Sequence, residues 1–160
     1  MSISRQYLIA MAGTVCLFLS AATTDPVSYP DGFRKWVHIR TGLIGPESPA
    51  FEMYGGMHHI YANAKAMEGF AAGKFPDGAM LAFDLHDVLE SKGNTTEGPR
   101  KKIEVMVKDS RRYPSTGGWG FERFVGDGQS PVLADPDRAK CFACHQGQRN
   151  NDSVFSTAPK

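Results

Sequence analysis

The sequence predicts an α+β fold, an antiparallel β-sheet with a few short helices, one of which lies near the C-terminus. Two observations support this fold class. Large apolar residues recur at every second position over several short runs, as they do in strands with one buried face. Apolar residues at helical spacing are confined to short stretches. The 160 residues, 41% of them hydrophobic, suit a single globular domain.

Strand patterns occupy five segments of the sequence. The clearest is 79–85, where Leu81, Phe83 and Leu85 share one face and Asp84 lies on the other. The other predicted strands are 33–39, 57–62, 103–108 and 119–124. The segments rich in Gly, Pro or polar residues are predicted loops, namely 41–49, 91–100 and 126–134.

Two helices are predicted together with their ends. The alanine-rich segment 64–72 has apolar residues at helical spacing, and Gly73 can end it in the left-handed conformation. A second helix is expected to begin with Asp135 as the N-cap and Pro136 in the first turn, and to end at Gly147.

The second predicted helix contains Cys141-Phe142-Ala143-Cys144-His145, the attachment signature of a c-type haem. Cysteines three residues apart lie on neighbouring faces of one helical turn, where each thiol can form a thioether with a haem vinyl group. The imidazole of His145 then lies beneath the ring as a ligand to the iron. The sequence therefore predicts one covalent haem c per chain, held by Cys141, Cys144 and His145.

Two other uses of the cysteine pair remain open at this point. An exported protein can form a structural disulfide between Cys141 and Cys144. A zinc site needs about four ligands, usually with a second Cys or His pair at similar spacing. The remaining histidines, which form no second pair at metal spacing, are His38, His58, His59 and His86.

Residues 1–22 have the pattern of a secretory signal peptide, so the haem domain is expected to be 23–160. Arg5 precedes an apolar run, 7–19, that is too short to span a bilayer, and small residues follow the run. Cys16 lies within the run and would be removed with it. Covalent attachment of haem c normally takes place outside the cytoplasm, so the motif and the signal agree on a periplasmic protein.

The charge balance argues against some classes of partner. Without Arg5, the mature chain has 17 basic and 17 acidic side chains. A chain without net charge favours neither nucleic acid nor an anionic membrane surface as a partner. No second apolar run is long enough for a membrane helix.

The late position of the haem motif argues against the common small cytochromes. Helical electron carriers have the motif near the N-terminus and a ligating methionine well downstream, but no Met or His follows His145. Four-helix cytochromes have four long amphipathic patterns, which this sequence lacks.

Six short motifs follow one another in a specific order along the chain. They are Tyr29-Pro30-Asp31-Gly32-Phe33 with Trp36, Lys74-Phe75-Pro76-Asp77-Gly78-Ala79, Val107-Lys108-Asp109-Ser110, Gly118-Trp119-Gly120-Phe121, Cys141 to His145, and Asp152-Ser153-Val154-Phe155. With them the sequence resembles the cytochrome P-460 and cytochrome c′-beta superfamily over nearly all of the mature chain. The resemblance implies a homodimer on an antiparallel sheet, His145 as the proximal ligand and an open distal position.

Members of this superfamily divide by their distal side. The hydroxylamine-oxidising branch has a lysine cross-linked to the haem edge, at a position that is Phe83 in this sequence. Cytochromes c′-beta have phenylalanine there, one of two aromatic residues that cap the iron, and bind nitric oxide. The resemblance therefore implies that Phe83 covers the open face, with Phe51 or Tyr54 as the second aromatic residue. The alternative is that Phe83 is an ordinary core residue.

Lysines and histidines elsewhere have both a functional and a structural interpretation. Lys65 and Lys74 are candidate amines for a haem cross-link, but a solvated surface position is the usual outcome for such lysines. His58 or His59 falls near the distal arginine of the hydroxylamine-oxidising branch. The favoured interpretation is a sheet histidine with a satisfied hydrogen bond.

Charged residues around the motif have a similar double interpretation. Asp135 and Asp137 precede the haem motif, where they are expected to stabilise the helix N-terminus rather than to accept a proton. Arg123 is expected on the surface or beside a haem propionate.

Three functions are compatible with these patterns. The preferred one is a haem protein with five-coordinate iron and an apolar distal pocket, which binds nitric oxide or a related small nitrogen species with a redox role. A hydroxylamine oxidoreductase would need an amine at the haem edge. A plain electron carrier would need a sixth ligand such as Met53, Met57, Met80 or a histidine.

Overall fold

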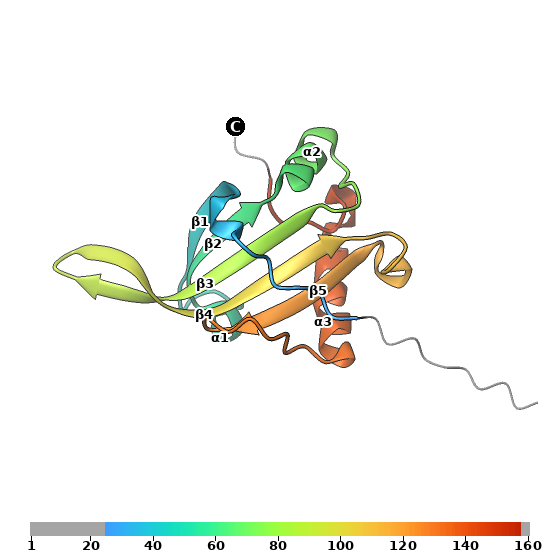
Figure 1. Cartoon of the computed structure of the whole chain (residues 1–160). Helices are drawn as coiled ribbons and strands as arrows, with labels where there is room; N and C mark the ends of the chain where they lie inside the picture. The colour runs from blue at the N-terminus through green and yellow to red at the C-terminus, as the bar shows by residue number, and fades with distance from the viewer. Residues whose placement is uncertain (1–24, 158–160) are drawn as a thin grey trace, which may run out of the picture.

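A five-stranded antiparallel sheet forms the centre of the protein (Figure 1). The structure is a computed structural model that describes residues 25–157. The strands lie in sequence order, so each strand pairs with its neighbours in the chain. They are β1 (Val37–Ile44), β2 (Gly56–Ala62), β3 (Met80–Ser91), β4 (Asn94–Lys108) and β5 (Trp119–Val125). The predicted signal peptide, 1–22, lies outside the described residues.

Short helices connect the strands and follow the last one. The α-helices of the described residues are α1 (Phe51–Tyr54), α2 (Ala64–Ala72) and α3 (Asp135–His145). The 3-10 helices are η1 (Phe33–Lys35), η2 (Pro114–Thr116) and η3 (Gln146–Asn151). The predicted α+β fold with a C-terminal helix that carries the haem motif is therefore confirmed. Within the described part of the chain, no helix combines the length and the apolar composition needed to cross a bilayer.

The cross-strand pairs divide the sheet into two faces. In Figure 1 the N-terminal segment crosses in front of the sheet and α3 lies behind it. The face toward α3, here the α3 face, carries a row of direct neighbours from β2 to β5, which is Ile60, Phe83, Glu104 and Arg123. The next row on this face is Ala62, Leu81, Met106 and Phe121. The predicted alternation in 79–85 is thus confirmed, because Phe83 and Leu81 share this face.

Each face has its own hydrophobic core. On the α3 face, Leu81, Met106, Trp119 and Phe121 are buried, and Phe142 of α3 packs against them. The core of the opposite face, here the η1 face, consists of Val27, Phe33, Ala82, Ile103, Val105, Tyr113 and Phe124. The two cores share the sheet between them, so the residues of one strand alternate between two separate environments.

The segment 91–100 was predicted to be a loop, and this prediction is wrong. It belongs to a long β3–β4 hairpin, which extends beyond the rest of the sheet (Figure 1). Lys92 and Gly93 connect the strands with φ of 50° and 80°, the conformation of a tight hairpin turn. The segment 91–100 has no core to cover, so it consists of polar residues, Gly and Pro, and the alternating signal is absent.

Two other predicted boundaries also change. The chain forms η1 before β1, and β1 then continues to Ile44 through half of the predicted loop 41–49. Gly32 has a φ of 67° and turns the chain so that Phe33 enters the core of the η1 face. Because of this tertiary contact, residues 33–35 form η1 in place of the first part of the strand predicted for 33–39.

The structure confirms the predicted bounds of α2. Asn63 caps α2 by accepting a hydrogen bond from the Ala66 N–H (2.8 Å), and Gly73 ends it with φ of 72°. Asp135 is not the N-cap of α3, because it is already helical and its carboxylate pairs with Arg138 at 2.8 Å. The helical conformation also does not end at Gly147, because the 3-10 helix η3 follows α3 directly and includes this residue.

A buried carboxylate, Asp84, organises the charges of the η1 face. Its oxygens accept hydrogen bonds from the Arg34 Nε (2.9 Å) and the Arg100 Nε (2.6 Å), and its side chain is fully buried. Burial acts to raise the pKa of Asp84, but the hydrogen bonds from Arg100, His86 and Arg34 outweigh it and hold the pKa below 3.8. The ionised carboxylate thus ties η1 to β3 and β4.

Asp84→Asn should lower the free energy of unfolding at pH 7 by about 3 kcal/mol, because two arginines lose their buried partner. A depressed pKa contributes stability above the unfolded-state pKa and loses it as the pH falls through the lower folded-state pKa. The free energy of unfolding of the wild type, measured in urea, should therefore fall between about pH 5 and pH 2. In the variant it should depend less on acid pH. Equal acid dependence in both proteins would contradict this role.

Candidate haem site

The helix α3 presents the two cysteines of the motif one turn apart. The thiol of Cys141 is half-buried beside the core of the α3 face, and Cys144 is exposed. Both thiols are free, so no disulfide joins Cys141 and Cys144 in this structure. Burial raises the pKa of the Cys141 thiol, which keeps it protonated.

A single hydrogen bond defines the tautomer of His145. Its Nδ1–H donates to the backbone carbonyl of Ser153 at 2.8 Å. Because a carbonyl only accepts, Nδ1 carries the proton and the lone pair is on Nε2. Burial lowers the pKa of His145, so the imidazole is neutral near pH 7. The rings of Phe121 and Phe155 flank it at 5.1 and 5.0 Å between centroids.

The α3 face offers an apolar surface next to these donors. Ile60, Met67, Phe70 and Phe142 pack against its core but are only partly buried. Half-exposed apolar side chains beside two free thiols and a neutral imidazole fit a haem, whose ring is apolar and whose iron takes an imidazole nitrogen. They do not fit a zinc ion, because the described residues contain no group of three or more His, Cys, Asp or Glu placed to hold a metal.

A carboxylate, Glu104, connects this donor set with the distal candidate Phe83. Its Oε1 accepts hydrogen bonds from the Arg123 Nε at 2.7 Å, and Lys102 Nζ lies 3.1 Å away. The charge of Glu104 acts on the pKa of both Cys141 and His145, and Phe83 is its direct neighbour on β3. Phe83 is thus one strand further from the motif than Glu104.

Phe83 lies in a cluster of aromatic rings on the α3 face. The imidazole of His58 stacks on it with centroids 4.8 Å apart at 18°, and Tyr54 approaches edge-on at 5.7 Å. Of the two candidates for a second aromatic residue, Tyr54 therefore contacts Phe83. Lys102 Nζ lies 4.2 Å from the centre of the Tyr54 ring.

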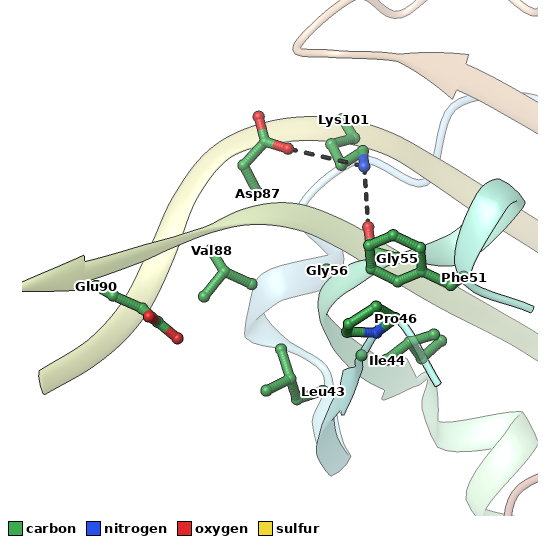
Figure 2. A pocket seen from close by; sticks show the side chains of 11 residues that line it. Leu43, Ile44, Pro46, Phe51, Gly55, Gly56, Asp87, Val88, Glu90 and Lys101 are labelled. Carbon is green, nitrogen blue, oxygen red and sulfur yellow. Dashed lines mark hydrogen bonds and ion pairs between the residues drawn. The ribbon is translucent and has the colours of Figure 1, made fainter. Parts of the chain in front are cut away.

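Phe51 lies outside this aromatic cluster and borders a cavity. Its ring is 42% exposed and borders a cavity of about 300 Å³ with residues of β1 and of the β3–β4 hairpin (Figure 2). There Lys101 donates a hydrogen bond to the Gly55 carbonyl at 2.9 Å and lies 3.7 Å from Asp87. This cavity contains no thiol or imidazole, so it is separate from the haem motif.

The two neighbouring histidines of β2 have different environments. His58 is 6% exposed on the α3 face, and its buried Nδ1 has no hydrogen-bond partner, so the expectation of a satisfied histidine is wrong for this residue. The ring fits only because Gly42 lacks a side chain, since a Cβ there would lie 2.5 Å from its Cε1. His59 lies on the opposite face, where its Nδ1 is 2.8 Å from the Thr41 hydroxyl.

Most of the other candidates lie away from the motif. Lys65 is exposed and pairs with Glu68 at 3.2 Å, and Lys74 is exposed as well. Asp137 pairs with Lys140 at 2.9 Å on the surface of α3. Among the methionines proposed as sixth ligands, Met53 is 61% exposed, while Met57 and Met80 occupy the η1 face by their register.

Two residues of the site were not recognised from the sequence, Glu104 and Lys102. The alternation visible from Ile103 to Lys108 puts Glu104 on one face, and its extension by one residue toward the N-terminus puts Lys102 on the same face. What the sequence lacked was the information that this face is the one beneath α3. Without it, Glu104 and Lys102 look like ordinary solvated positions of a strand.

The two free thiols and the adjacent imidazole of α3 are the donor set of the C-x-x-C-H motif, which indicates a haem protein. The chain matches the Cytochrome P460 family over residues 30–156, and it belongs to this family. The match confirms the resemblance of the short motifs and supports haem as the cofactor. A comparison with individual curated proteins finds no significant match.

Cys144→Ser should leave the haem attached through Cys141 alone, because the two thiols bind separate vinyl groups. Intact mass should still include the haem, and the alkaline pyridine spectrum should shift to longer wavelength because one vinyl group stays unsaturated. The double variant Cys141→Ser with Cys144→Ser should lose covalent haem. Cys16→Ser is the control and should change neither readout. Covalent haem on the peptide of residues 141–145 in the double variant would disprove the assignment.

Proposed function

We propose that the protein is an exported monohaem c-type cytochrome that binds nitric oxide or a related small nitrogen species at an open iron position. Cys141 and Cys144 hold the haem by thioethers, and His145 Nε2 is its proximal ligand. When bound, the haem supplies an iron centre that takes a small ligand and exchanges electrons. Phe83 lines the far side of the site, with Tyr54 as its aromatic neighbour. The resemblance further implies a homodimer.

The observation that carries this proposal is the position of Phe83 on the α3 face. It shares a row with Glu104, whose charge reaches His145, and it packs between His58 and Tyr54. An aromatic ring in this position excludes water by its bulk and offers no hydrogen bond to a polar ligand. It therefore favours small neutral diatomic ligands over hydroxylamine or peroxide.

The candidate methionines support an open position rather than a sixth protein ligand. Met57 and Met80 are on the opposite face of the sheet from α3, and Met53 projects into solvent. The electron-carrier alternative would need a methionine or a histidine on the side of Phe83, and of these candidates only His58 lies there. The placement of the methionines therefore disfavours a methionine-ligated electron carrier.

The reduced holoprotein should have the absorption spectrum of five-coordinate high-spin haem, and it should bind nitric oxide and carbon monoxide. Phe83→Ala should increase the association rate of carbon monoxide about tenfold, because removal of the ring lowers the barrier to entry by about 1.4 kcal/mol. Flash photolysis would measure this rate.

Tyr29→Ala is a matched control for this experiment, because it removes a half-buried ring from the η1 face. Its association rate should equal that of the wild type. A six-coordinate low-spin spectrum of the reduced protein would disprove the open position. An unchanged rate in Phe83→Ala would show that Phe83 is a core residue without contact to the ligand.

A specific observation keeps hydroxylamine oxidation as a second candidate function. The Lys102 side chain is only 12% exposed and lies on the α3 face beside Tyr54 and Glu104. Burial lowers the pKa of Lys102, although the charge of Glu104 opposes this effect. A partly desolvated amine is a better nucleophile than the solvated Lys65 or Lys74. Lys102 could therefore form the bond to the haem edge that Phe83 cannot.

Peptide mapping of the purified holoprotein would distinguish the two functions. The nitric-oxide function predicts that the haem remains attached only to the peptide of Cys141 and Cys144, with no shift of the main absorption band to the red. The enzyme function predicts a second haem-linked peptide with Lys102, which Lys102→Arg would remove. Lys101→Arg is the control, because Lys101 points to the cavity of Figure 2.

A further inference from the structure

The chain segment after the haem helix has an unusual backbone. Asp152 and Ser153 both have positive φ, 47° and 65°, in a region that residues other than glycine rarely occupy. Such conformations persist only where the surrounding contacts impose them. The consequence here is specific, because the carbonyl of Ser153 is the acceptor for His145 Nδ1–H at 2.8 Å.

Four hydrogen bonds fix this strained turn, and three of them involve Asp152 directly. One carboxylate oxygen of Asp152 is 2.7 Å from Lys108 Nζ, and the other accepts the Phe75 N–H at 2.8 Å. The Asp152 carbonyl accepts the indole N–H of Trp119 at 2.7 Å. On the Ser153 side, the backbone N–H bonds to the Gln148 carbonyl at 2.9 Å.

Lys108 in turn is held in place at the end of β4. Its side chain is 7% exposed, and Nζ also donates to the Gly117 carbonyl at 3.0 Å. The ammonium lies 4.8 Å from the centre of the Trp119 ring, which is fully buried. An ion pair with a buried lysine and this many fixed partners has a defined geometry, so the end of β4 fixes the position of the turn.

We propose that the Lys108–Asp152 ion pair is a positioning device for the proximal ligand: it holds the Ser153 carbonyl against His145 Nδ1 and thereby sets the strength of that hydrogen bond. The inference rests on the proposed role of His145 as the iron ligand. Lys108 and Asp152 do not contact the haem-binding donors themselves. They act through the backbone of Ser153, so neither side chain needs a direct chemical role at the haem.

The strength of this hydrogen bond has a measurable consequence. A carbonyl that accepts the Nδ1–H firmly increases the basicity of Nε2, because negative charge shifts into the imidazole ring. A more basic ligand stabilises the oxidised iron and lowers the reduction potential. Release of the Ser153 carbonyl should therefore weaken the bond between His145 and the iron and raise the potential.

The test compares the holoproteins of Asp152→Asn and Lys108→Met with the wild type. Asp152→Asn keeps the size of the side chain and the acceptor for Phe75 N–H but loses the charged pair. Lys108→Met removes the same pair from the other partner. Both variants should lower the iron–histidine stretching frequency of the reduced protein in resonance Raman spectra, and both should raise the reduction potential.

Asp77→Asn is a matched control. Both oxygens of Asp77 also accept hydrogen bonds, from the Ser110 N–H at 2.8 Å and the Ser110 hydroxyl at 2.7 Å, but neither bond reaches Asp152 or Ser153. Its stretching frequency and potential should equal those of the wild type. If Asp152→Asn and Lys108→Met match this control in both readouts, the ion pair is only structural and the inference is wrong.

Failure of either variant to fold does not prevent a test. In the reduced wild type, the inference predicts that the His145 Nδ1–H exchanges slowly with solvent, and rapid exchange in the proton NMR spectrum would overturn it. The outcomes also separate the inference from the proposed function. A sixth protein ligand would defeat the ligand-binding function, while the reduction potentials of the variants would still test the positioning role.

Discussion

The hydrogen bond from His145 Nδ1–H to the Ser153 carbonyl is the interaction on which the site depends. It fixes the tautomer, so that Nε2 is the nitrogen with a free lone pair. It also closes the segment η3 into a loop, because donor and acceptor are eight residues apart in the chain. The last turn of the haem helix and the chain after it therefore behave as one unit, which Asp152 and Trp119 attach to the sheet.

The sheet separates two kinds of environment. On the η1 face, the buried carboxylate of Asp84 is neutralised by Arg34 and Arg100, and the charges there have protein partners. On the α3 face, partly buried apolar residues remain next to the haem motif, and Glu104 with Arg123 is at their edge. Both faces thus contribute a buried core, and the α3 face in addition has partly buried apolar residues beside the haem motif. The alternation of a strand makes this division possible, because neighbouring residues belong to opposite faces.

Local patterns were sufficient for the elements that have strong local signals. The helix 64–72 was predicted with its bounds, because alanine-rich helical spacing and a terminal glycine are both properties of adjacent residues. The strand residues Leu81 and Phe83 were placed on one face for the same reason. The β3–β4 hairpin was missed where it leaves the sheet, because a strand without a core has no hydrophobic period.

The amino-acid sequence by itself determined the α+β class, the haem motif and the membership in its family, since each rests on short runs of residue types in a specific order. Only the tertiary structure decided which residues meet the motif. Glu104, Lys102 and Tyr54 come from segments distant in sequence from Cys141 and share its surroundings because of strand register and helix packing. The partner of His145 is likewise a backbone carbonyl, and every residue has one. Its position comes from a turn that the Lys108–Asp152 pair holds, and that pair joins residues 44 positions apart.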